Sequence, residues 1–309
     1  MVSLPRLAGL VLLLLQLLGS TVVARAEPIT IAIGIDAAFT PFYLANQRGL
    51  FKKAGLDVTI LRLSQGGEAM DAVIAGQAQL GVAADQTVIL RLPRGDVRPI
   101  GIVEESGTYL KAAARPGLSD PKEIKKLGIV KGTVSEYSAT MMMKKYGLSR
   151  DSVTLVAAGA PEFAALVSRG DIDAFFSWEP FPTIAARQGA KILMTSGEAG
   201  YTYTMWVNAA GPWLAKNEKD AKAILAVLAE ANALITADPA AAAADLQAQT
   251  KLPAADTLPL IKGVVWTMRD FNDDDLKSFA GIADFLAEQK ITPARVDVPK
   301  YLQRGFYKP

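Results

Sequence analysis

The chain contains two copies of one sequence pattern, and this internal repeat restricts the possible folds more than any other feature. In each copy a glycine ends a predicted helix, a short apolar run follows, and an acidic residue closes the run. The matched positions keep one order along the chain: Gly34 with Gly132, Phe39 with Tyr137, Gly49 with Gly147, Glu68 with Glu162, Val73 with Val167, Gly76 with Gly170, and Asp85 with Glu179. Two long matched blocks in the same order predict two similar α/β lobes.

The repeat also predicts where a ligand would bind. Each copy begins with a strand, turns at a glycine and enters a helix. In α/β units, ligands lie beyond the carboxyl ends of the strands, where the N-termini of helices point outward. Two such lobes that face each other form a cleft. We expect Trp178 and Glu179 at one lip of this cleft and Asp85 at the other.

Residues 1–26 have the pattern of a secretory signal sequence. Arg6 supplies the basic start, and Leu10–Leu18 supply the apolar run. The small residues Ala24 and Ala26 then form a cleavage site, so we expect cleavage after Ala26. The apolar run is too short to cross a bilayer about 30 Å thick, and the chain has no cysteine to carry a lipid. An exported chain without cysteine is typical of a bacterial periplasmic protein.

Composition limits the partners and the chemistry. Removing Arg6 and Arg25 with the signal would cancel the formal net charge of +2. No basic stripe with interleaved aromatic residues occurs, so nucleic acid is not expected as a partner. The chain has no histidine and no cysteine, which excludes histidine-containing triads, cysteine nucleophiles and histidine-based zinc sites. We expect no metal and no cofactor.

The acidic residues at the ends of the two repeats leave one catalytic interpretation open. Asp85 and Glu179 could form a carboxylate pair across the cleft, as in glycosidases. The alternative is that each acid caps the helix that follows it and interacts with the positive end of that helix.

Runs rich in β-branched residues alternate with helical patterns, which predicts mostly parallel sheets. The predicted strands are 28–35, 56–63, 80–83, 97–103, 127–130, 153–156, 174–176, 190–193 and 203–208. The predicted helices are 41–48, 68–75, 85–92, 135–146, 161–169, 220–237, 239–249, 258–266 and 274–289. We expect crossings between the lobes near residues 107–116 and 208–213. Lobe 1 would then comprise residues 27–110 and 210–309, and lobe 2 residues 111–209.

Two turns of the first lobe carry candidate ligand-binding residues. They are Phe39, Thr40, Pro41, Phe42, Gln65 and Gly66. Phe39 could stack on a ligand or pack beneath its loop, and both interpretations remain open. Thr40 has the residue type of a helix cap, and Pro41 suits the first helical position. The loop at Gln65 lies at the expected edge of the cleft.

The second lobe contains a matching set of candidate ligand-binding residues. Thr133 and Ser135 bring hydroxyl groups close to free backbone donors, which suits an anion or a carbonyl group. Simple capping by Ser135 is the alternative. Glu136 either completes the cap or faces the ligand. Trp178 follows a buried strand, where it could stack on a ligand or belong to the core.

Several stretches of the chain resemble one protein family. They are Phe42–Ala45 (FYLA), Gly49–Phe51 (GLF), Ala54–Val58 (AGLDV), Gly76–Gly81 (GQAQLG), Lys131–Thr133 (KGT), Gly170–Ala174 (GDIDA), Trp178–Pro180 (WEP) and Val296–Asp297 (VD). With these motifs the chain resembles the periplasmic solute-binding proteins of ABC importers. The similar branch contains binders of sulfonates, taurine, nitrate and thiamine pyrimidines and is called NMT1/THI5-like. The resemblance covers nearly all of residues 28–309.

The resemblance implies an α/β, two-lobed periplasmic-binding-protein (type II) fold with the ligand cleft between the lobes. It implies a protein without enzymatic activity that captures a small organic solute and delivers it to an ABC permease in the inner membrane. The implied ligand contacts are Phe39–Phe42, Gln65, Gly66, Asp85, Thr133–Glu136, Trp178 and Glu179. We expect a monomer. The alternative is an exported enzyme or sensor domain on the same scaffold, although the pyrimidine-synthase enzymes of the superfamily rely on histidine.

Glu136 departs from the pattern of the sulfonate-binding members, whose turn is serine-rich and not acidic. A buried carboxylate beside a sulfonate is costly without a countercharge, and Lys131 is the single cation that the motifs place nearby. We therefore predict a neutral or nitrogen-bearing solute in preference to a simple sulfonate or nitrate. The counter-argument is that converging helix N-termini favour an anion.

Overall fold

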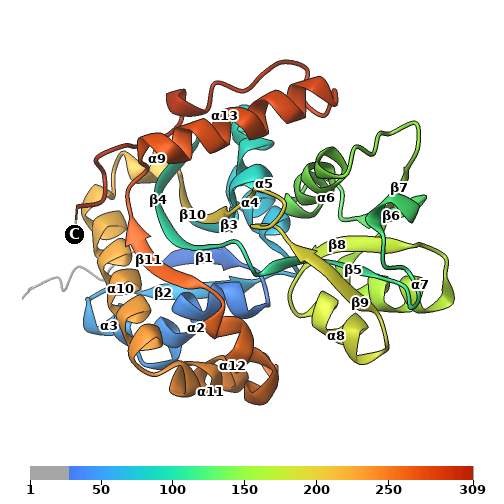
Figure 1. Cartoon of the computed structure of the whole chain (residues 1–309). Coiled ribbons are helices and arrows are strands. Elements are labelled where there is room, and N and C mark those ends of the chain that lie inside the picture. The colour runs from blue at the N-terminus through green and yellow to red at the C-terminus, as the bar shows by residue number, and fades with distance from the viewer. Residues whose placement is uncertain (1–27, 309) are drawn as a thin grey trace, which may run out of the picture.

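The computed structural model describes residues 28–308. The predicted signal sequence, residues 1–26, lies outside the described residues. Two separate β-sheets, each covered by helices, form two lobes side by side (Figure 1). The predicted two-lobed α/β architecture is confirmed.

The first lobe is built on a six-stranded sheet. In spatial order its strands are β11 (Val265–Arg269), β4 (Val97–Ser106), β10 (Tyr203–Ala210), β3 (Leu80–Ala84), β1 (Ile29–Ile33) and β2 (Val58–Arg62). β1 pairs in parallel with β2 and β3, whereas β10 runs antiparallel between β3 and β4. The isoleucines of β1 are buried, as expected for a strand with helices on both faces.

The second lobe is built on a five-stranded sheet. In spatial order its strands are β7 (Thr154–Ala157), β6 (Lys126–Ile129), β8 (Ala174–Trp178), β5 (Leu110–Ala114) and β9 (Lys191–Thr195). β6 pairs in parallel with β7 and β8, whereas β5 runs antiparallel between β8 and β9.

Helices cover both faces of each sheet. The α-helices are α2 (Thr40–Gln47), α3 (Leu50–Lys53), α4 (Gly66–Ile74), α5 (Asp85–Ile89), α6 (Val134–Lys145), α7 (Phe163–Arg169), α8 (Phe181–Arg187), α9 (Gly211–Leu214), α10 (Glu218–Ala237), α11 (Pro239–Thr250), α12 (Ala254–Lys262) and α13 (Asp273–Glu288). In the first lobe, α2 packs with α10 and α11 on one side of the sheet, and α4, α5 and α13 lie on the other side (Figure 1). In the second lobe, α7 packs against α8, and α6 lies on the opposite face (Figure 1).

The repeat in the sequence corresponds to a repeat in the topology. The order β2-β1-β3-β10-β4 in the first sheet matches the order β7-β6-β8-β5-β9 in the second. Gly76 and Gly170 end α4 and α7 with φ angles of 73° and 75°. Glycine adopts this left-handed conformation without the steric cost that other residues meet. The shared backbone turn therefore explains why the glycines recur at matched positions.

The first connection between the lobes falls within the predicted stretch, and the second lies earlier than predicted. Residues 107–116 contain β5, so the first connection between the sheets is the short segment 107–109. The chain returns to the first sheet between β9 and β10, through residues 196–202, which is earlier than the expected crossing at 208–213. Each connection ends in an antiparallel strand that enters the middle of the other sheet. These strands, β5 and β10, lie outside the matched sequence blocks, which end at Asp85 and Glu179. The sequence repeat therefore could not indicate them.

The C-terminal third adds a strand that the sequence pattern did not indicate. Residues 258–266 were predicted as one helix, but α12 ends at Lys262 and β11 begins at Val265. β11 pairs with β4 at the edge of the first sheet.

Within residues 28–308, no single helix is long and apolar enough to cross a bilayer. The bent pair α10–α11 is long and apolar enough together, judged by length and composition only.

Candidate ligand-binding site

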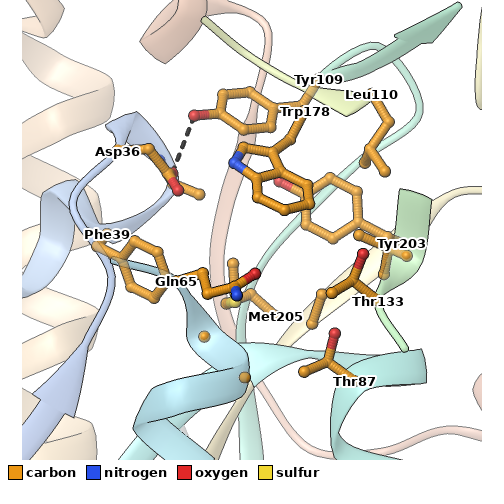
Figure 2. A pocket seen from close by; sticks show the side chains of 15 residues that line it. Asp36, Phe39, Gln65, Thr87, Tyr109, Leu110, Thr133, Trp178, Tyr203 and Met205 are labelled. Atoms are coloured by element: carbon orange, nitrogen blue, oxygen red, sulfur yellow. Dashed lines mark hydrogen bonds between the residues drawn. The ribbon is translucent and has the colours of Figure 1, made fainter. Parts of the chain in front are cut away.

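A cavity lies between the two lobes, and residues from both lobes line it. It contains about 460 Å³ of space that no atom fills, including the part open to solvent. The rings of Tyr109, Trp178 and Tyr203 gather on one side, and Phe39 and Gln65 lie across from them (Figure 2).

Five of the residues predicted from the sequence line this cavity. They are Phe39, Gln65, Gly66, Thr133 and Trp178. Each lies at or beyond the carboxyl end of a strand, where the repeat predicts the ligand. Trp178 is half-buried and packs edge-on against Phe181, with ring centroids 6.3 Å apart. The indole therefore has one side packed on protein and another that faces the cavity.

Three other candidates of the first lobe belong to the protein interior. Thr40, Pro41 and Phe42 are buried at the start of α2 and do not line the cavity. The Thr40 hydroxyl donates to the Ala37 carbonyl at 2.6 Å, so its polar group is already satisfied. These three residues instead fix the start of α2 behind Phe39.

Ser135 and Glu136 are held by their own turn. The Ser135 hydroxyl accepts from the Val130 N–H at 2.8 Å and donates to the Phe176 carbonyl at 2.6 Å. Glu136 accepts from the Gly132 N–H at 2.9 Å and lies 3.7 Å from a guanidinium nitrogen of Arg150. Neither side chain lines the cavity. The preference for a nitrogen-bearing solute that rested on Glu136 therefore loses its basis.

Asp85 is buried beside the second connection between the lobes. Its Oδ1 accepts from the Gln86 N–H at 2.7 Å and from the Tyr201 hydroxyl, and its Oδ2 accepts from both the N–H and the hydroxyl of Thr204. Burial raises the pKa of Asp85 to about 6, although these donors oppose the shift. The carboxylate thus holds the returning chain and does not line the cavity.

Glu179 has a similar structural role in the second lobe. Its carboxylate accepts from Lys111 Nζ at 2.5 Å and from the N–H and hydroxyl of Thr183. Neither Glu179 nor Asp85 lines the cavity, so the carboxylate pair of a glycosidase is not formed there. No group of three or more acidic side chains able to hold a metal occurs among residues 28–308.

The acidic residue that does line the cavity is Asp36, which lies between the predicted strand 28–35 and the predicted helix 41–48 and was not among the candidates. Asp36 caps the short 3-10 helix Ala37–Phe39, because its Oδ1 accepts from the Ala38 N–H at 2.9 Å. The same oxygen accepts from the Tyr109 hydroxyl at 3.0 Å (Figure 2). Burial raises the pKa of Asp36 to about 6. Its position directly after a predicted strand was the signal that could have identified it.

A second acid stands behind the cavity wall. Glu104 is fully buried in β4, and the Tyr203 hydroxyl lies 2.9 Å and 3.2 Å from its two oxygens. Burial raises its pKa well above the ordinary value, and the charges of Asp36, Glu105 and Asp85 add to the shift. Tyr109 and Tyr203, which both line the cavity, therefore connect it to two buried acids. The repeat could not indicate these tyrosines, because both lie in or after the connecting segments.

The start of α4 supplies backbone donors to the cavity. Gly66 and Gly67 both line it and occupy the first turn of the helix, where backbone N–H groups have no partner within the helix. The N-cap residue Gln65 forms no side-chain cap. A hydrogen-bond acceptor on a ligand could therefore bind here.

We expect Gly66→Ala to lower the free energy of unfolding by about 2 kcal/mol and Gly67→Ala to have a smaller effect. A Cβ atom on Gly66 would lie 2.8 Å and 2.9 Å from the Cβ and Cα of Ala83, which are fixed in β3. A Cβ atom on Gly67 would instead meet the movable end of Arg91 at 2.9 Å. Chemical denaturation of the two variants would test this difference. Equal losses would contradict the steric argument.

Comparison with known proteins gives one family and one fold. The model of the family described as NMT1/THI5 like matches residues 36–242. The taurine-binding periplasmic protein of Escherichia coli (strain K12) is 21% identical over 302 residues, which cover 91% of this chain and 94% of that protein. The 4-amino-5-hydroxymethyl-2-methylpyrimidine phosphate synthase of Aspergillus parasiticus is 30% identical over 139 residues, covering 43% of this chain and 40% of that protein.

Among solved structures, the periplasmic aliphatic sulphonate binding protein SsuA from Escherichia coli superimposes with a TM-score of 0.80 at 20% identity. The match covers 92% of this chain and 94% of that chain. At this identity the similarity establishes the periplasmic-binding-protein fold.

Proposed function

Because this chain belongs to the NMT1/THI5-like family, we propose that it is the solute-binding protein of an ABC importer. It captures a small organic solute in the periplasm and delivers it to a permease in the inner membrane. It performs no chemistry on the solute. The observation that carries this proposal is the cavity between the lobes, which side chains of both lobes and of the connections between them line together.

The geometry suits binding that is coupled to closure. Tyr109 lies in the first connection, and its hydroxyl donates to Asp36 of the first lobe. Trp178 faces the same cavity from the second lobe. A solute that contacts both lobes stabilises the closed arrangement, and a permease can recognise that arrangement.

The related sulfonate- and taurine-binding proteins support solute binding over catalysis. The chain contains no histidine or cysteine, and the acids Asp85 and Glu179 are both held by protein donors outside the cavity. Residues 1–26 would direct export, and the mature chain would act as a monomer.

The direct test is a thermal-shift screen of residues 27–309. The panel contains taurine, ethanesulfonate, nitrate, cytosine and benzylamine. We expect at least one of them to raise the melting temperature, because a ligand that binds the folded state stabilises it. A panel without any stabilising compound would contradict the proposed function. Genes for a permease and an ATPase beside this gene would support delivery to an importer.

We expect Trp178→Ala to weaken binding of the stabilising compound by about 2 kcal/mol, or about thirtyfold. The indole provides the largest ring in the cavity. Titration calorimetry measures the change, and Phe181→Ala is the matched control, because Phe181 packs against Trp178 but does not line the cavity. Unchanged affinity with a lower melting temperature would show that Trp178 serves the core.

A further inference from the structure

We infer that the solute is an organic cation whose protonated nitrogen binds Asp36 and whose carbon skeleton packs between the aromatic rings of the cavity. The inference rests on the proposed function, since it specifies the class of solute that the binding protein captures.

The charge of the cavity wall is the first observation. Asp36 is the one charged side chain among the residues from 28–308 that line the cavity, and neither lysine nor arginine contributes to the lining. An anionic solute would therefore meet a carboxylate without a neighbouring side-chain cation. A cationic solute would supply the missing countercharge.

Asp36 has one carboxylate oxygen available for a ligand. Its Oδ1 accepts both the Ala38 N–H and the Tyr109 hydroxyl, at 2.9 Å and 3.0 Å. Its Oδ2 accepts no hydrogen bond from any residue between 28 and 308. A carboxylate can accept several hydrogen bonds at each oxygen. The two protein donors thus fix the orientation of the group, and the second oxygen can receive an N–H donor from the solute.

The surroundings of Asp36 strengthen the preference for a cation. Asp36, Asp85 and Glu104 are all buried, and none of them takes part in an ion pair within the described part of the chain. Glu104 is subject to the negative charges of both aspartates. A positive charge in the cavity lowers the electrostatic free energy of all three acids, whereas a negative charge raises it.

The rings of the cavity suit the remainder of such a solute. Phe39, Tyr109, Trp178 and Tyr203 all line it (Figure 2). Aromatic faces attract cations and also provide apolar contact area. The N–H groups of Gly66 and Gly67 require an acceptor, which a neutral oxygen or a ring nitrogen of the same molecule can provide. The helix start therefore does not demand an anionic solute.

The test uses three probes that share a benzyl group and differ in charge: benzylamine, benzyl alcohol and phenylmethanesulfonate. Titration calorimetry at pH 7.5 with residues 27–309 should give benzylamine an affinity at least about tenfold higher than that of either other probe. Asp36→Asn should weaken benzylamine about 10- to 100-fold, because it removes a charge-assisted hydrogen bond. The asparagine can still accept from Ala38 and Tyr109, so the variant should fold. Asp57→Asn at an exposed position is the control and should leave binding unchanged.

The outcomes separate this inference from the function on which it rests. Phenylmethanesulfonate binding as tightly as benzylamine would overturn the inference and leave the binding function intact. Benzylamine affinity that does not respond to Asp36→Asn would also overturn it, as would failure of benzylamine to bind when taurine, ethanesulfonate, nitrate or cytosine does. If none of these compounds binds, the proposed function fails and the inference fails with it.

Discussion

Replacing Lys111 with methionine is expected to lower the free energy of unfolding by about 3 kcal/mol at pH 7.5. Lys111 Nζ lies 2.5 Å from Glu179 Oε1, and the Glu179 side chain is only 1% exposed. Without Lys111, the carboxylate keeps its bonds to the Thr183 N–H and hydroxyl but loses the one ion pair that it forms within residues 28–308. A buried charge that loses its partner carries a desolvation penalty that is no longer offset.

Three further variants separate the broken pair from other effects of the substitution. Lys131→Met removes an exposed lysine and should change stability by less than about 0.5 kcal/mol. Glu179→Gln should cost less than Lys111→Met, because the partly exposed lysine can turn to water. The double variant Lys111→Met/Glu179→Gln should recover much of the loss, since no unpaired charge remains. Urea unfolding of the wild type, Lys111→Met, Glu179→Gln and the double variant gives the coupling energy between the two side chains. Equal midpoints for Lys111→Met and Lys131→Met would refute the argument.

The ion pair also positions the cavity wall. Leu110 and Trp178 are paired across β5 and β8, and both line the cavity. Lys111 is the next residue of β5, and Glu179 comes directly after the end of β8. The Glu179 N–H donates to the Tyr109 carbonyl at 3.1 Å. Thus the pair fixes the ends of two strands that present three cavity residues.

The sequence predicted those parts of the fold that depend on local signals. The turn glycines Gly76 and Gly170 need a left-handed backbone, and their recurrence predicted the repeated units. β5 (Leu110–Ala114) has no such signal, because its alanines sit between neighbouring strands in the middle of a sheet and show no alternation of apolar and polar residues. β11 was hidden for another reason, since its apolar residues continue the spacing of α12.

Position along a strand explains which of the predicted candidates line the cavity. Thr133 lies after β6 and Trp178 ends β8, and both line the cavity. Asp85 does not line it, because a distant partner decides its role: it is satisfied by Tyr201 and Thr204, far along the chain. Such long-range pairings leave no trace in local spacing. Asp36 did carry a local signal, its position directly after a predicted strand, but its bond to the Tyr109 hydroxyl is again a long-range pairing.

In the absence of solute, the protein is expected to be more stable at pH 5 than at pH 7.5, by about 3 kcal/mol. The pKa of Asp36 and that of Asp85 rise from the ordinary value of 3.8 to about 6 in the folded protein, mainly because burial disfavours the charged form. As the pH falls through 6, the folded chain takes up protons that the unfolded chain does not yet bind. Protonation thus favours folding, the gain is complete below pH 3.8, and each group contributes between about 1 and 2 kcal/mol by pH 5. Glu104, whose pKa is raised well above its ordinary value, acts in the same direction.

Urea unfolding at the two pH values measures this gain. Acids with lowered pKa values, such as the half-buried Asp173 and the exposed Asp274, lose their contribution only at a pH below their ordinary range, so they do not interfere at pH 5. Asp36→Asn removes one titrating group and should reduce the gain by about half, whereas the exposed control Asp57→Asn should leave it unchanged. Saturating benzylamine should also reduce it, because a cation beside Asp36 favours the ionised carboxylate. A protein that is equally stable or less stable at pH 5 would show that the buried acids are ionised at little cost, and the electrostatic basis for a cationic solute would then be lost.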